Sequence, residues 1–191
     1  MTEDRDQQSA LLMQALARGR DDALNALMAM WTAPLIGYLS KLTGSVATGE
    51  DLAQETLVRV YRHKLDYRPH QKFSTWLFTI ATNLAKNFHR WKRRHPEQSH
   101  ESGDIQALSF TSTQEDPSEV MSRCETMKAL DAAMQQLPEL MREALLLSTM
   151  QGLSHGQIAR IQDSSDKAVE LRIYRARKML REKLADHWDT P

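Results

Sequence analysis

The sequence predicts an all-α protein built from two small helical domains that are joined by a flexible linker. Apolar residues recur at spacings of three and four along most of the chain, caps separate these runs, and no stretch alternates as a strand would. Residues 96–116 contain a Pro, a Gly, several Ser and several acids. Such a length without periodicity is unusual inside one compact domain, so we expect domains at 1–95 and 117–191 with an acidic linker between them.

Four helices are expected in the first domain, over residues 8–18, 22–42, 48–63 and 73–94. The first two are expected to stop at Gly19 and Gly44. Thr48 and Asp51 have the spacing of a capping box, and Ser74 is placed to cap the last helix. The segment between 63 and 74 contains a proline and several cations, which favours a loop.

Four more helices are expected in the second domain, over residues 117–136, 139–150, 154–162 and 165–186. Ser154 and Gln157 form a capping box, and Asp163 and Ser164 turn the chain. A short helix, a tight turn and a longer basic helix are typical of a helix-turn-helix. The last helix has a buried seam, predicted at Val169, Ile173, Ala176, Leu180 and Leu184.

The helix over 73–94 carries two stripes at helical spacing. One is apolar and is expected to face a core, with members Leu77, Ile80, Leu84, Phe88 and Trp91. The other consists of an aromatic residue, a threonine, amides and arginines, namely Trp76, Thr79, Asn83, Asn87, Arg90 and Arg94. Amides can pair with base edges, an aromatic ring can stack on an unpaired base, and arginines hold phosphates. The alternative is a solvated outer face, with the tryptophan packed on Tyr61 and Trp31.

The charges are segregated although the formal net charge is zero. Residues 59–94 contain ten Lys or Arg and only one acid, residues 97–125 contain seven acids and only one Arg, and residues 167–183 are basic again. Local patches rather than the sum determine binding to nucleic acid, so the neutral total does not argue against it.

Several function classes find no support in the sequence. A single Cys excludes an internal disulfide and a multi-cysteine zinc site, and the seven His residues are scattered. Glycine-rich phosphate loops, zinc-protease motifs and nucleophile elbows are missing, so we expect neither an enzyme nor a cofactor. The amino terminus lacks the pattern of a secretory signal and no run is bilayer-like, which favours a cytoplasmic protein.

Two sets of residues resemble one known family. Asp51-Leu52-Ala53-Gln54-Glu55-Thr56, followed by Phe73, Trp76-Leu77, Ile80-Ala81 and Asn83, resembles region two of bacterial extracytoplasmic-function (ECF) sigma factors. Region four of the same group is similar to a second set, consisting of Leu137-Pro138, Arg142, Gly152-Leu153-Ser154, Gln157-Ile158-Ala159, Val169 and Tyr174-Arg175-Ala176-Arg177. The two sets occur in the family's order and spacing. The chain departs from the common pattern at Gln157, Asp163, Ala168 and Glu170.

The resemblance implies a sigma factor that directs promoter recognition, DNA melting and transcription initiation. Its partners would be core RNA polymerase, promoter DNA and an anti-sigma factor, the last either free or anchored in a membrane. The expected polymerase-binding residues are Asp51, Gln54 and Glu55. The expected minus-ten residues are Lys72, Trp76, Asn83, Asn87, Arg90, Arg93 and Arg94. The expected minus-thirty-five residues are Lys167, Glu170, Arg172, Arg175, Arg177 and Lys178.

A classical transcription regulator with a helix-turn-helix and a helical sensor domain is the main alternative. The second domain alone fits either class of protein. The first domain favours the sigma factor, because a sensor domain has no need for the acidic helix start at 51–55 or the amide and arginine stripe. The two functions also differ in behaviour, since a regulator binds duplex DNA without polymerase.

Overall fold

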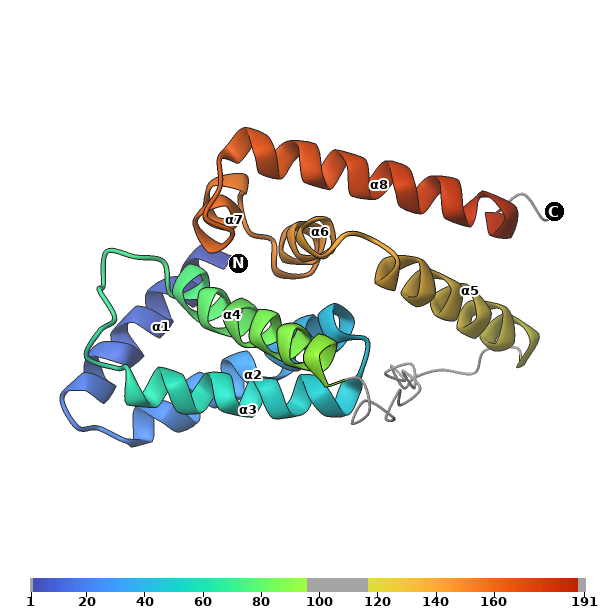
Figure 1. Cartoon of the computed structure of the whole chain (residues 1–191). Helices are drawn as coiled ribbons and strands as arrows, with labels where there is room; N and C mark the ends of the chain where they lie inside the picture. The colour runs from blue at the N-terminus through green and yellow to red at the C-terminus, as the bar shows by residue number, and fades with distance from the viewer. Residues whose placement is uncertain (1, 96–116, 189–191) are drawn as a thin grey trace.

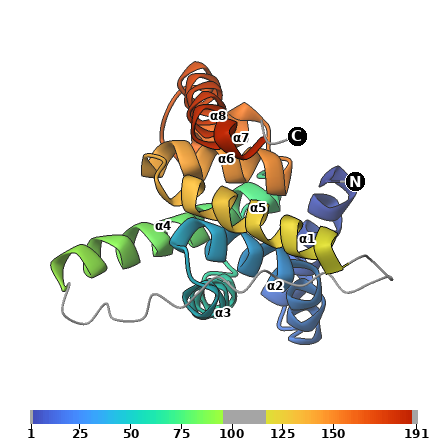
Figure 2. The ribbon, with the colours of Figure 1, turned by 90° about the vertical axis from the view of Figure 1, so that its right-hand side faces the viewer.

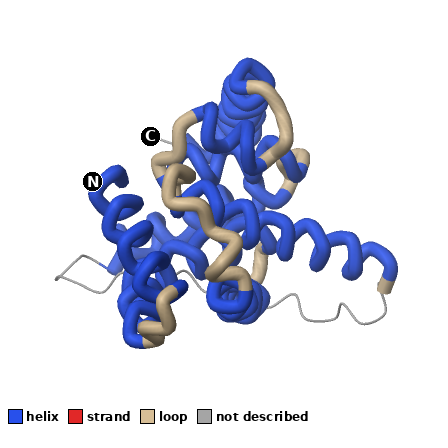
Figure 3. The backbone as a smooth tube through the Cα atoms, turned by 90° about the vertical axis from the view of Figure 1, so that its left-hand side faces the viewer, coloured by secondary structure: helices blue, strands red, loops and turns tan. Residues whose placement is uncertain are grey.

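The computed structural model describes residues 2–95 and 117–188, and within these ranges it contains helices and loops but no strand (Figures 1 and 3). The helices are α1 (Thr2–Ala17), α2 (Asp22–Thr43), α3 (Val46–Arg62), α4 (Phe73–Arg94), α5 (Pro117–Gln135), α6 (Glu139–Gln151), α7 (His155–Ile161) and α8 (Asp166–Trp188). We call α1 to α4 the N-terminal bundle and α5 to α8 the C-terminal bundle. The all-α prediction is confirmed, and the expected linker at 96–116 lies outside the described residues.

The helix ends follow local chemistry, with two corrections. Gly19, Gly44 and Gly152 all have positive φ after helices, which favours glycine and confirms the stops predicted at Gly19 and Gly44. The predicted cap at Thr48 is wrong, because the side chain of Ser45 accepts a hydrogen bond from the Thr48 amide and α3 begins at residue 46. The first helix also begins at residue 2 rather than 8.

The start of α4 is capped by a side chain from another helix. Asp6 on α1 accepts hydrogen bonds from the backbone N–H of Ser74 at 2.7 Å and from its hydroxyl at 2.9 Å. Ser74 is therefore a donor within the first turn and not the predicted cap. A carboxylate at this end also satisfies the positive end of the helix dipole. Because this bond joins the first helix to the fourth, it fixes where the α4 face begins.

Helix α2 is the centre of the N-terminal bundle and contacts α1, α3 and α4. Trp31 is buried and its indole N–H donates to Ser9 at 2.9 Å. The rings of Phe73 and Phe78 lie 5.6 and 6.1 Å from it. Tyr38 shares a buried 2.9 Å hydrogen bond with Thr82, and burial raises its pKa well above the usual value. These contacts bury one side of α4 and turn the other outward.

The far end of α4 extends beyond the bundle (Figure 2). Leu77 and Leu84 of the predicted apolar stripe are buried, but Trp91 is 44% exposed. The prediction of a buried Trp91 is wrong because the helix extends past the end of the core that it packs against. The indole instead stacks against His95 at 5.1 Å.

The segment between α3 and α4 has no helix, as expected, yet part of it packs. Tyr67 is buried, stacks near Phe73 and Trp76, and donates its hydroxyl to the Gln71 carbonyl. Tyr61, near the end of α3, is partly exposed, with the Lys64 ammonium over its ring. The buried tyrosine therefore anchors a loop whose proline and cations predicted that it would not pack.

The C-terminal bundle has the predicted helix-turn-helix. The capping box between Ser154 and Gln157 is present in both directions, and Asp163 adopts the left-handed conformation at the turn. Val169, Ile173 and Ala176 are buried, which confirms the seam of α8. Ser165 accepts from the Ala168 amide and begins that helix.

The two bundles are in contact, and α6 lies between α8 and the N-terminal bundle (Figure 1). Buried apolar residues of both bundles belong to one continuous cluster. One group at this contact is poorly satisfied. Glu143 on α6 is fully buried, and no hydrogen bond of good geometry reaches either carboxylate oxygen. The Lys86 ammonium lies 3.5 Å away and the Gln162 side chain is nearby. Burial raises the pKa of Glu143, and the Lys86 charge opposes that shift.

We expect Glu143→Gln to stabilise the protein at neutral pH. A carboxyl whose pKa is raised by folding takes up a proton on folding, so wild-type stability falls as pH rises from the unfolded value of about 4.3 through the folded pKa. The variant lacks this loss. The free energy of unfolding, measured by urea denaturation, should therefore exceed that of the wild type by an amount that grows with pH. The difference should level off at about 1 kcal/mol, the cost of one poorly satisfied buried group.

The matched control for this experiment is Glu139→Gln, one turn earlier on α6, where the side chain is 31% exposed and pairs with Arg93. An advantage of Glu143→Gln that is constant with pH, or that shrinks as pH rises, would show that ionisation of the buried carboxyl does not cost stability.

Candidate nucleic-acid interface

The outward face of α4 carries the predicted amide and arginine stripe free of the core. Asn83, Asn87, Arg90 and Arg94 are all exposed. Arg90 donates to the Asn87 side chain at 3.4 Å, a weak contact that leaves both groups free to bind a ligand. A helix with amides in its middle and cations at its end can contact bases and phosphates at once.

Trp76 lies at the start of this face and is only partly buried. Its ring packs on Tyr67 and Phe73, at 5.2 and 6.0 Å. The predicted packing partners Tyr61 and Trp31 are therefore replaced by residues next to it. The ring is partly exposed and contacts Tyr67 of the loop at 63–72, so the same side chain holds the loop and contributes to the outward face.

Two predicted cations lie away from the centre of the stripe. Lys72 is exposed and reaches Glu3 at 3.4 Å. Arg93 lies on another side of α4 and points towards Glu139 of the C-terminal bundle, at 3.7 Å. The structure thus gathers the amides, Arg90 and Arg94 on one face and separates Arg93 from them.

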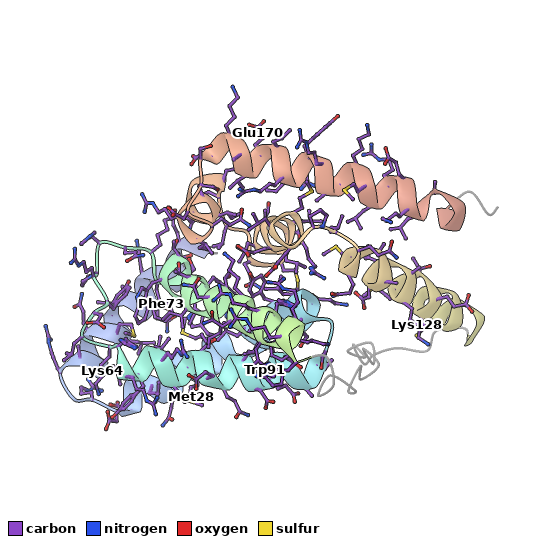
Figure 4. All side chains as sticks on the ribbon, in the orientation of Figure 1. Met28, Lys64, Phe73, Trp91, Lys128 and Glu170 are labelled. Atoms are coloured by element: carbon purple, nitrogen blue, oxygen red, sulfur yellow. The ribbon has the colours of Figure 1, made fainter. Side chains whose placement is uncertain are left out.

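The outer side of α8 carries the second predicted face (Figure 4). Glu170 lies there, on the side away from the rest of the protein. The other exposed residues of this set are Lys167, Arg175, Arg177 and Lys178. Arg172 behaves differently, because it donates to Gln162 at 2.7 Å and to Ser164 at 2.9 Å. One terminal nitrogen of Arg172 therefore braces the turn of the helix-turn-helix.

Three residues of the α8 face were not among the predicted site residues, namely Tyr174, Arg181 and Glu182. Tyr174 is 65% exposed, and with Arg177, Lys178, Arg181 and Glu182 it lines a shallow hollow of about 410 Å³. The spacing of 174, 178 and 181 follows one helix face and could have identified them. An aromatic ring between cations suits a sugar and phosphate backbone.

A third surface, on α3, is acidic. Asp51 and Gln54 are exposed, and Glu55 is 41% exposed in its ion pair with Arg59 at 2.8 Å. All three lie on one side of the helix, away from buried Ala53, Thr56 and Leu57. The side chains are accessible, and an exposed i,i+4 pair is easily exchanged for an intermolecular one.

The described residues give little support for a metal site or a membrane-spanning helix. Within residues 2–95 and 117–188, His, Cys, Asp and Glu side chains form no group of three or more that could hold a metal ion. In that same part of the chain, every helix is too short or too polar to span a bilayer. Cys124 is a free, partly buried thiol on α5.

Residues of both bundles match models of known protein families. Residues 27–95 match sigma-70 region 2, and residues 127–180 match sigma-70 region 4. The chain is 31% identical to the RNA polymerase sigma-H factor of Pseudomonas aeruginosa over 94% of both chains. It is 30% identical to the ECF RNA polymerase sigma-E factor of Escherichia coli, over 91% of this chain and 93% of that one. It is also 31% identical to the sigma factor CarQ of Myxococcus xanthus, over 91% and 96%.

Solved structures share the fold. CnrH, in complex with the cytosolic domain of CnrY, aligns over 94% of this chain and 98% of that chain with a TM-score of 0.71 and 23% identity. The sigma factor RpoE of Bartonella quintana, in complex with the anti-sigma factor NepR, aligns over 86% and 98% with a TM-score of 0.64 and 22% identity. Sequence and fold agree, and the chain belongs to the sigma-70 family of RNA polymerase sigma factors, in its ECF group.

Proposed function

We propose that this sigma factor uses three separate surfaces to bring core RNA polymerase to a promoter. The acidic face of α3, with Asp51, Gln54 and Glu55, would bind polymerase. The outward face of α4 would read the minus-ten element, and the outer side of α8 would read the minus-thirty-five element. The observation that carries this assignment is that all three faces are exposed although their helices pack on a common core.

The two DNA faces suit different forms of DNA. The α4 face joins amides to a partly exposed indole and a loop, which fits bases that melting has taken out of the duplex. The α8 face belongs to a helix-turn-helix, which fits a major groove. Glu170 at its outer side would accept a hydrogen bond from cytosine and repel phosphate, so it favours a base contact.

The same proposal covers the setting in which the protein works. It would contribute binding and orientation, while the polymerase catalyses RNA synthesis, and it would act in the cytoplasm, where the polymerase is. An anti-sigma factor, free or membrane-anchored, would be a further partner, by analogy with the complexes of CnrH with CnrY and of RpoE with NepR.

Run-off transcription tests the proposed function directly. Core polymerase with this protein and genomic DNA fragments should give defined transcripts, and core polymerase alone should not. Footprinting should show promoter protection only when polymerase is present. Protection of a specific duplex by the free protein, with no transcripts, would instead favour the classical regulator.

We expect Glu55→Lys to weaken binding to core polymerase at least about tenfold, or about 1.4 kcal/mol. The reversal places a cation on the acidic face and a like charge beside Arg59. Fluorescence titration with core polymerase measures the change. The control is Glu125→Lys, the same charge reversal at an exposed position on α5. Equal affinities of the two variants would remove Glu55 from the interface.

A further inference from the structure

The last turn of α4 carries an exposed tryptophan that the core does not use. Trp91 is 44% exposed, at the end of the helix that extends beyond the N-terminal bundle (Figures 2 and 4). Trp31, at the centre of that bundle, is buried and donates its indole N–H to Ser9. A single exposed apolar side chain is common on protein surfaces and needs no explanation. Trp91, however, belongs to a group of rings with a defined arrangement.

Two neighbouring rings fix the plane of the Trp91 indole. The His95 ring lies 5.1 Å from it at an interplanar angle of 25°, and the Phe88 ring lies 6.5 Å from it at 29°. The Nδ1–H of His95 donates to the Trp91 carbonyl at 3.0 Å, which holds the imidazole in place. The indole is therefore oriented before a partner arrives, and a side chain that is already ordered loses little conformational entropy on binding.

The charge around these rings favours an anionic partner. Four of the last five residues of α4 are cations, and the whole helix contains no Asp or Glu. Arg93 pairs with Glu139, which leaves three cations for a ligand, namely Arg90, Lys92 and Arg94. Cations also suit the C-terminal end of a helix dipole, but the dipole gives no reason for stacked, exposed rings among them. Cations beside accessible aromatic rings are typical of surfaces that bind nucleic acid.

Trp91 is next to the amide and arginine stripe of the same helix. It follows Asn87 by four residues and precedes Arg94 by three, so it lies about 40° and about 60° around the helix from them. Along the helix axis, Trp91 is about 6 Å beyond Asn87. A strand that runs along α4 past Asn87 would reach Trp91 about two nucleotides further on, at about 3.4 Å for each. The rings therefore continue the proposed minus-ten face.

We propose that Trp91 binds promoter DNA, with its indole packed against a base or sugar just beyond the bases that Asn83 and Asn87 read. The inference rests on the proposed function of the α4 face and adds a different kind of contact to it. Contact with a ring carries little sequence information, because every base has a flat face. The indole is also uncharged, so its contact releases no counterions and leaves the salt dependence of binding unchanged.

Substitutions of Trp91 in the full chain test this contact. Trp91→Leu keeps an apolar side chain that favours helix but removes the flat ring, whereas Trp91→Phe keeps a ring. The control is Leu11→Ala on α1, where the side chain is 66% exposed. Each variant is titrated with core polymerase alone. The assembled complex is then titrated with single-base variants of one promoter at several salt concentrations, and circular dichroism checks the helicity.

We expect Trp91→Leu to weaken binding to every promoter variant about 5- to 100-fold, with the salt slope and the affinity for core polymerase unchanged. Trp91→Phe should keep most of the promoter affinity and Leu11→Ala all of it. Unchanged promoter affinity of Trp91→Leu, or a loss limited to one base, would overturn the inference. A loss that is already present with core polymerase alone would assign the ring to a protein contact and overturn it too.

A measurement without polymerase separates this inference from the proposed function. A single-stranded oligonucleotide at low salt should quench the tryptophan fluorescence of the free protein, and Trp91→Phe should remove part of that quenching. Equal quenching in the wild type and Trp91→Phe would contradict contact between Trp91 and DNA. Failed run-off transcription with Trp91-dependent quenching would remove the proposed function alone, whereas normal transcription with variants that match the wild type would remove only the contact at Trp91.

Discussion

Replacing Gly49 by alanine should destabilise the protein by about 3 kcal/mol, because α2 and α3 touch at this residue. A Cβ added to Gly49 would lie 2.2 Å from the hydroxyl oxygen of Ser40, 2.6 Å from its backbone nitrogen and 2.8 Å from its Cα. Two of these atoms belong to the α2 backbone, so no rotamer change can remove the clash. The helices must move apart, which would loosen the packing of both against the core.

Urea denaturation of the full chain measures the loss, which corresponds to a fall in Tm of about 6 to 12 °C for a chain of this size. The matched control is Gly37→Ala, also in a helix, where the new Cβ meets Met150 at an ordinary 3.5 Å. That change should be neutral or stabilise by up to about 1 kcal/mol, since alanine favours helix.

A second variant separates the two sources of the clash. Ser40→Ala removes the hydroxyl, which is buried and has no hydrogen-bond partner, but leaves the backbone atoms in place. We therefore expect the double variant, with Ser40→Ala added to Gly49→Ala, to recover little of the free energy of unfolding that Gly49→Ala loses. Full recovery would show that the side chain, and not the approach of the helix backbones, limits this position.

Displacement of α3 would also affect polymerase binding. Gly49 lies two residues before Asp51, at the start of the acidic face. The position of that face relative to α4 depends on how closely α3 approaches α2. Gly49→Ala should therefore weaken binding to core polymerase even where the protein remains folded, although the residue itself is buried.

The local features of the fold could be predicted from the sequence. The stripes of α4, the capping box at Ser154 and the helix stops at glycines depend on residues within a few positions of one another. Long-range features could not. Asp6 caps α4 from 68 residues away, and nothing near Ser74 in the sequence indicates that partner. Trp91 has the spacing of a core residue, but the core ends before the helix reaches it.

The candidate site divides in the same way. The residue types on α4 and α8 indicate nucleic acid by their chemistry and spacing alone, and their exposure agrees with that prediction. The hydrogen bonds of Arg172 could not be predicted, because their acceptors, Gln162 and Ser164, lie ten and eight residues earlier, on the other side of the turn. Likewise, segregated charge in the sequence suggests DNA, whereas Lys86 and Arg93 face acids of the other bundle.

The amides and the arginine at the end of α4 should respond differently to mutation. We expect Asn83→Ala and Asn87→Ala each to reduce promoter binding by about 1 to 3 kcal/mol, a loss that disappears when one particular base of the minus-ten element is changed. An amide in contact with a base edge reads that base alone. Arg94→Ala should weaken all promoter variants alike and lower the salt slope by about 1, since a phosphate contact carries no sequence information.

The test is a matrix of these three variants, assembled with core polymerase, against single-base changes of one promoter, with permanganate reporting melted bases. Lys92→Ala is the control for loss of charge, because Lys92 lies about half a turn around α4 from Asn83. It should change binding and the salt slope less than Arg94→Ala does. If both asparagine variants reduce transcription uniformly across all promoter changes, the amide stripe binds DNA without reading it, and sequence selection at the minus-ten element belongs to the loop at 63–72 that Tyr67 anchors beside Trp76.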